Sequence, residues 1–134
     1  MRQLIYGAVA ALLMTSFMAS AQATVRIDIK NDSTEDCSVA LNARIDHTKW
    51  LTVGWYVYAA GEEAPIILDE VNDIRAVYLY HDCSLKVGEN DETKRAWVKV
   101  NRKFSDTVPM DGQEGYEEVT FIRLQQSQYV IPSF

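Results

Sequence analysis

The 134-residue chain is poor in several residue types, and each shortage excludes a class of protein. It has only 6 Gly and 3 Pro, and no long biased tract, which argues against a collagen-like or disordered chain. Basic residues are outnumbered, 13 Lys and Arg against 19 Asp and Glu, and they form no cluster, so we expect no nucleic-acid partner. The hydrophobic fraction of 48% is sufficient for one packed domain.

The first 23 residues have the three parts of a secretory signal peptide. Arg2 supplies the positive start, an apolar stretch follows from Leu4 to Phe17, and Ala21-Gln22-Ala23 matches the small-x-small cleavage motif. We predict a signal peptide at 1–23, a single domain at 24–134 and a periplasmic or secreted protein, with no membrane insertion after cleavage. An uncleaved anchor is the alternative, because the apolar stretch with its flanks approaches the roughly 17 residues that span a bilayer.

The chain contains only two cysteines, Cys37 and Cys83. Two thiols of an exported protein are more often joined than free, because the compartment is oxidising. A redox-active pair is disfavoured, since the Cys-x-x-Cys spacing that lowers a thiol pKa is absent. We therefore predict one disulfide between Cys37 and Cys83.

Apolar residues recur mostly at every second position, which is typical of strands with one buried face. Val25, Ile27 and Ile29 alternate with charged residues, and a second alternating run covers 37–44 after a polar turn. Further candidate strands are 52–59, 65–68, 74–81, 95–100 and 117–124. An amphipathic helical stripe is lacking, so we predict an all-β fold, an antiparallel β-sandwich of about seven to nine short strands.

Four aromatic residues, Trp50, Trp55, Tyr56 and Tyr58, lie within nine positions of the sequence. If Trp55 and Val57 face inward, Tyr56 and Tyr58 face the other way, because neighbouring strand residues alternate between faces. Such rings can stack on a sugar or contact a protein partner. We therefore predict these four residues as a binding surface, with packing inside the core as the alternative interpretation. Trp97 poses the same question.

The run from Lys49 to Gly61 contains a Trp-x3-Gly-Trp-aromatic pattern that ends in Gly. It resembles the core motif of the bacterial domain of unknown function 1036 family. The turn Asn31-Asp32-Ser33 and the late segment Gly115-Tyr116-x-x-Val119-x-Phe121 are similar to other parts of that family. The resemblance covers most of the chain after residue 23, and it implies a small exported or periplasmic β domain without an assigned activity or catalytic residue.

The sequence does not assemble a nucleophile, a base and an orienting acid. After residue 23 it has two histidines, His47 and His81, each next to an Asp in the chain. Neighbouring strand residues point to opposite faces, so adjacency does not create an Asp–His hydrogen bond. Spacings such as His-x-His or His-x3-His, which indicate a metal site, are also absent. We therefore predict no catalytic residue, no metal and no cofactor.

These observations favour an exported, non-catalytic binding protein of the cell envelope. The first hypothesis is recognition of an envelope or secreted protein, including an immunity or inhibitor role, because an acidic domain complements a basic target. The second is a carbohydrate-binding module that uses Trp50, Tyr56 and Tyr58 as stacking groups. The third is a small metal-dependent hydrolase around His47 and His81.

Overall fold

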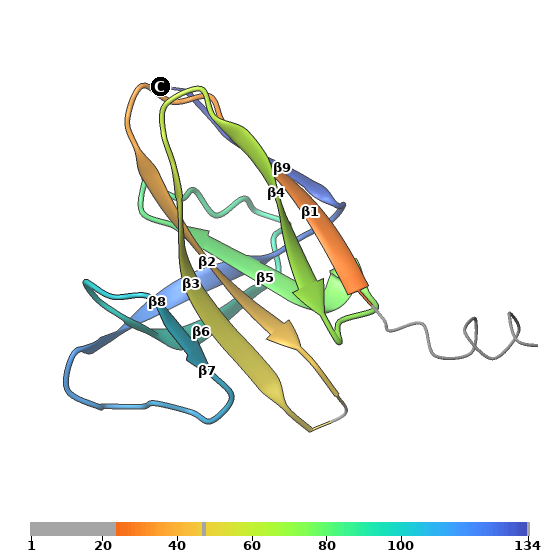
Figure 1. Cartoon of the computed structure of the whole chain (residues 1–134), viewed down its shortest axis with the longest axis vertical. Coiled ribbons are helices and arrows are strands. Elements are labelled where there is room, and N and C mark those ends of the chain that lie inside the picture. The colour runs from red at the N-terminus through yellow and green to blue at the C-terminus, as the bar shows by residue number, and fades with distance from the viewer. Residues whose placement is uncertain (1–23, 47, 134) are drawn as a thin grey trace, which may run out of the picture.

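The computed structural model describes residues 24–46 and 48–133 as a domain built almost entirely of strands (Figure 1). The predicted signal peptide, 1–23, and His47 lie outside the described residues. Within those residues nine strands and one short 3-10 helix form, and the predicted all-β fold is confirmed. The elements in chain order are β1 (Thr24–Asn31), β2 (Cys37–Arg44), β3 (Trp50–Tyr58), β4 (Glu63–Asp69), η1 (Ile74–Ala76), β5 (Val77–His81), β6 (Thr93–Lys99), β7 (Phe104–Asp106), β8 (Tyr116–Arg123) and β9 (Gln128–Ile131).

The strands make two sheets, a three-stranded sheet in the order β4-β1-β9 and a six-stranded sheet in the order β6-β8-β5-β2-β3-β7. All neighbours in the six-stranded sheet are antiparallel. One pairing departs from the antiparallel prediction, because β9 lies parallel to β1. The chain reaches β9 from β8 by crossing from one sheet to the other, and such a crossover, unlike a tight hairpin, can deliver a parallel strand.

The first core fills the space between the two sheets. On β1 the side chains of Val25, Ile27 and Ile29 are buried, as their alternation with charged residues predicts. They belong to the same cluster as Val39 and Leu41 of β2 in the six-stranded sheet. Each fully buried side chain of this size stabilises the fold by about 1.5–3 kcal/mol.

A second core lies on the other face of the six-stranded sheet, because this sheet curls. Strands β6 and β8 bend back toward β3, at the lower left of Figure 1, and β3 and β6 come into contact. The face that they enclose is called the concave face below. Its buried residues are Ala40, Tyr78, Val98, Phe104, Val119 and Phe121.

Strand β3 contains a bulge that changes which side chains face the first core. The pairing with β2 shifts between Val39 and Ala40, and Trp55 is the extra residue. Beyond the bulge Tyr56 and Tyr58 pack in the first core, whereas Trp55 packs on the concave face. Tyr56 and Tyr58 thus face away from Trp55, as alternation predicts, but the side that they face is the core between the sheets and not a partner.

The turn after β1 is held by the side chain of Asn31, which is completely buried. Its Nδ2 atom donates to the carbonyl oxygens of Glu35, at 2.7 Å, and Tyr58, at 3.0 Å. Its Oδ1 atom accepts from the backbone N–H and the hydroxyl of Ser33. All the polar atoms of this amide are thus paired, and the turn is joined to the end of β3.

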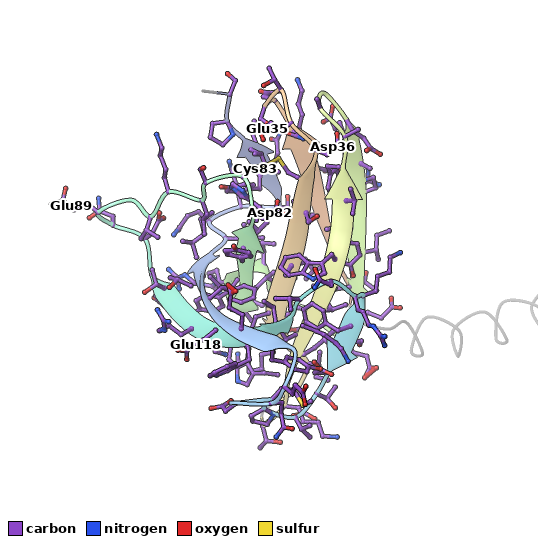
Figure 2. The ribbon with its side chains drawn as sticks, turned by 90° about the vertical axis from the view of Figure 1, so that its left-hand side faces the viewer. Glu35, Asp36, Asp82, Cys83, Glu89 and Glu118 are labelled. Carbon is purple, nitrogen blue, oxygen red and sulfur yellow. A yellow bond between two sulfur atoms is a disulfide. The ribbon has the colours of Figure 1, made fainter. Side chains whose placement is uncertain are left out.

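The predicted disulfide is present, and it joins Cys37, at the start of β2, to Cys83, just after β5. Figure 2 shows Cys83 at the upper end of the molecule, close to the labelled Glu35, Asp36 and Asp82. A disulfide is compatible with an extracellular or periplasmic protein. Within the residues described, the structure has no helix with the length and apolar character that crossing a membrane requires.

Candidate ligand-binding site

The four aromatic residues predicted as a binding surface do not share one face. Trp50 and Trp55 contact the concave-face core, whereas Tyr56 and Tyr58 contact the core between the sheets. The Tyr58 ring is only 3% exposed, and its hydroxyl donates to the carbonyl oxygen of Ala64 at 3.0 Å. The structure therefore brings the two tryptophans to the concave side and separates the two tyrosines from them.

Trp55 links β3 to β6 across the concave face. Its indole Nε1–H donates to the carbonyl oxygen of Lys99, on β6, at 2.8 Å. Its ring makes edge contacts with Tyr80 and Phe104, at centroid distances of 6.0 and 5.8 Å. Trp55 also lines an open groove of about 470 Å³. We call this the Trp55 groove.

A second hollow lies where the curled sheet does not close, between β3 and β7 on one side and β6 on the other. It has a volume of about 440 Å³, and the segment 107–111 after β7 forms part of its wall. We call it the seam cavity. Glu118, one of its lining residues, is labelled in the lower part of Figure 2, far from the disulfide. Its lining residues include Asn42, Trp50, Thr52, Lys94, Arg95, Trp97, Asp106, Asp111 and Glu118.

A row of three polar side chains crosses the concave face at this cavity. Asn42 on β2 pairs with Thr52 on β3, which pairs with Asp106 on β7. The Asn42 side chain is 2% exposed, and its Nδ2 atom donates to Oγ1 of Thr52 at 2.9 Å. The Oδ1 atom of Asn42 has no hydrogen-bond partner among the described residues. A buried amide oxygen without a partner is costly, and it marks a point where a ligand donor is favoured.

Lys94 reaches into the seam cavity from β6. Its Nζ atom lies 2.9 Å from the ring centroid of Trp50 and 5.7 Å from that of Tyr78. Burial lowers the pKa of Lys94 from 10.5 to about 8, so the amine is still mainly protonated at pH 7. The ring faces favour the charged form, as cation–π contacts do. No carboxylate of the described residues makes an ion pair with Lys94.

The other charged groups at the cavity have partners of their own or lie in the outer wall. Arg95 pairs with Glu118 at 3.0 Å. Asp106 accepts a hydrogen bond from the Tyr116 hydroxyl at 2.9 Å. Asp111 is exposed, in the turn after β7. The cavity thus combines an aromatic wall with separate donors and acceptors, a composition that suits a small polar ligand with a flat apolar face.

No motif in the sequence marks Asn42, Lys94 or Asp106 as a site residue. The apolar neighbours of Asn42, Leu41 and Ala43, face the first core, so alternation places the amide on the opposite face, as observed. Nothing in the local pattern indicates that this opposite face is enclosed. For Trp97 the sequence left both a binding surface and core packing open. The residue is half-buried and lines the seam cavity.

His81 is buried, and both of its ring nitrogens have partners. Nδ1 accepts the backbone N–H of Cys83 at 3.1 Å, and Nε2 lies 3.2 Å from the Tyr129 hydroxyl. Burial lowers the pKa of His81 to about 4, so the ring is neutral near pH 7. The described residues contain no group of three or more His, Cys, Asp or Glu side chains placed to hold a metal ion. His81 is therefore engaged inside the fold, and His47 is outside the described part.

Comparison with known proteins adds no family to these observations. The chain has no significant match among protein-family models, curated proteins or solved structures.

Proposed function

We propose that this protein is an exported, non-catalytic domain that binds a carbohydrate in the seam cavity. The observation that carries the proposal is the buried Asn42 amide, whose Oδ1 atom lacks a partner beside a cavity walled by Trp50 and Trp97. A sugar ring has an apolar face that packs on an indole and hydroxyl groups that donate to an amide oxygen. Thr52 and Asp106 supply further polar groups in the same row.

The export and the absence of catalysis are parts of the same proposal. Export is supported by the signal-peptide pattern and by the Cys37–Cys83 bridge, which suits an oxidising compartment. Binding without catalysis is supported by His81, because neither of its nitrogens is free to act as a base or a metal ligand. A relationship to the domain of unknown function 1036 family remains a proposal, and it assigns no residue a role.

The experiment is a glycan array probed with the purified domain, residues 24–134, followed by titration calorimetry on the sugars that bind. In the variant Trp97→Ala we expect about a tenfold or greater loss of affinity, because the ring forms part of the cavity wall. Val57→Ala is the matched control, since Val57 lies on the same sheet, is 62% exposed and lines the other groove. An array without binding, or equal affinities for the domain and Trp97→Ala, contradicts the proposal.

Protein recognition is the second candidate function, and the Trp55 groove favours it. Val57 and Val100 line this groove and are 62% and 38% exposed, so an apolar surface lies beside Trp55. A photo-crosslinking residue at position 57 is expected to capture one defined envelope protein in cells. The same residue at Ile67, which is 58% exposed on β4, is the control. Equal products at both positions contradict this function.

A further inference from the structure

The ligand class of the seam cavity follows from the charge of Lys94, and this inference rests on the proposed function. The Nζ atom of Lys94 contacts ring faces, and no described carboxylate pairs with it. Of the other charged residues that line the cavity, Arg95 and Glu118 pair with each other, and Asp106 accepts a hydrogen bond from Tyr116. Lys94 is thus a cation that contacts aromatic rings and has no ion-pair partner among the described residues.

Lys94 and Asn42 offer complementary groups to one ligand. The ammonium of Lys94 donates hydrogen bonds and carries positive charge, whereas the free Oδ1 atom of Asn42 only accepts. Trp50 connects them, because it contacts Lys94 and lies on β3 two residues from Thr52, the hydrogen-bond partner of Asn42. The geometry points to an acidic sugar, whose carboxylate pairs with Lys94 while a hydroxyl group donates to Asn42.

The acidic residues of the same cavity limit the charge of this ligand. Asp106 and Asp111 line the cavity and repel an anion, so a single carboxylate is accepted more readily than a dianionic phosphate. The two carboxylates differ in their surroundings: Asp106 accepts a hydrogen bond from the Tyr116 hydroxyl, whereas Asp111 is exposed to solvent. A uronic acid, with one carboxylate and several hydroxyl groups on a ring, satisfies these conditions.

The test compares matched sugars by titration calorimetry on the 24–134 domain. The probes are glucuronic and galacturonic acid, their methyl esters, which keep the shape and remove the charge, and glucose and galactose. We expect each acid to bind about tenfold or more tightly than its ester, because a charge-assisted hydrogen bond is lost. Lys94→Gln is expected to remove this preference and Lys94→Arg to retain it, and melting curves verify that both variants fold. Lys103→Gln, on the wall of the other groove, is the control that leaves the preference unchanged.

The outcomes separate this inference from the proposed function. Equal affinity for acid and ester in the unmodified domain overturns the acidic-sugar assignment and leaves carbohydrate binding in place. The same holds if none of these probes binds while neutral glycans on the array do. A preference for acids that survives in Lys94→Gln also overturns the assignment to Lys94. Absence of binding to every glycan overturns both.

Discussion

Acid is expected to destabilise the fold through His81. The ring is 1% exposed, and its Nδ1 atom accepts the backbone N–H of Cys83. Protonation of Nδ1 abolishes that acceptor and places a charge in the core. The nearby carboxylate of Asp82 opposes this effect, but burial dominates, and the pKa of His81 falls to about 4.

The direction and size of the effect follow from linkage between protonation and folding. The pKa of histidine is 6.5 in the unfolded chain and about 4 in the fold, so the unfolded state binds the proton more readily. Stability is therefore complete above pH 6.5 and is lost progressively as the pH falls toward 4. A pKa difference of this size corresponds to about 3 kcal/mol, a substantial part of the 5–15 kcal/mol typical of a small domain.

The assay is urea denaturation of the 24–134 domain at several pH values between 7.5 and 4. The matched variant is His81→Asn, whose carbonyl oxygen replaces Nδ1 as the acceptor for Cys83 and does not titrate. We expect the stability of the unmodified domain to fall by about 3 kcal/mol more than that of the variant over this range. Parallel curves for the two proteins would refute the reasoning, because every other titrating group is common to both.

Three further predictions concern stability and ligand binding. Replacing Cys37 and Cys83 together by Ala is expected to lower the free energy of unfolding by about 4 kcal/mol, because the disulfide closes a loop with a sequence separation of 46 residues and so restricts the unfolded chain. A loss near zero in urea denaturation would contradict this prediction. Gly54→Ala is expected to cost about 1–3 kcal/mol, because the added Cβ lies 3.0 Å from Cε1 of Phe104 and 3.2 Å from Cβ of Ala40. Adding Phe104→Leu should recover part of that loss, whereas an unchanged melting temperature in Gly54→Ala would disprove the close contact. The affinity for glucuronic acid is expected to be constant near pH 7 and to fall as the pH rises above about 8, where free Lys94 loses its proton, because burial lowers its pKa to about 8. Asp106, Asp111 and Glu118 line the same cavity and are unchanged in Lys94→Arg, which should show no such fall in calorimetry.

Local sequence patterns predict the strands because burial on β1 and β2 has period two. Val25, Ile27 and Ile29 are buried as their alternation indicates, and the predicted disulfide between Cys37 and Cys83 is present. The parallel neighbour of β1 was not predicted. The strand β9 has only four residues, and its pairing depends on where the chain returns after β8. That return is a property of the whole fold and has no local signature.

The candidate site was only partly predictable, for two physical reasons. A single bulge puts Tyr56 and Tyr58 on the face opposite Trp50, whereas an unbroken strand would place all three on one face. No residue pattern in β3 indicates the bulge apart from Gly54 beside Trp55. The curl of the six-stranded sheet then encloses Asn42 and brings Lys94 to Trp50 from a distant strand. Sequence alone assigns such polar residues to solvent, because alternation identifies two faces without telling which of them becomes an interior.

The bridging of β3 and β6 by side chains bears on the size of ligand that the proposed binding site would accept. These strands share no backbone ladder in the described region, and the indole donor of Trp55 and the ammonium of Lys94 span the gap instead. Rotation of these two side chains would widen the gap between β3 and β6 without breaking any strand pairing of the sheet. Under the proposed carbohydrate function, a longer glycan would enter only by displacing these two contacts, so selectivity for chain length would depend on two side chains and not on the strand pairings.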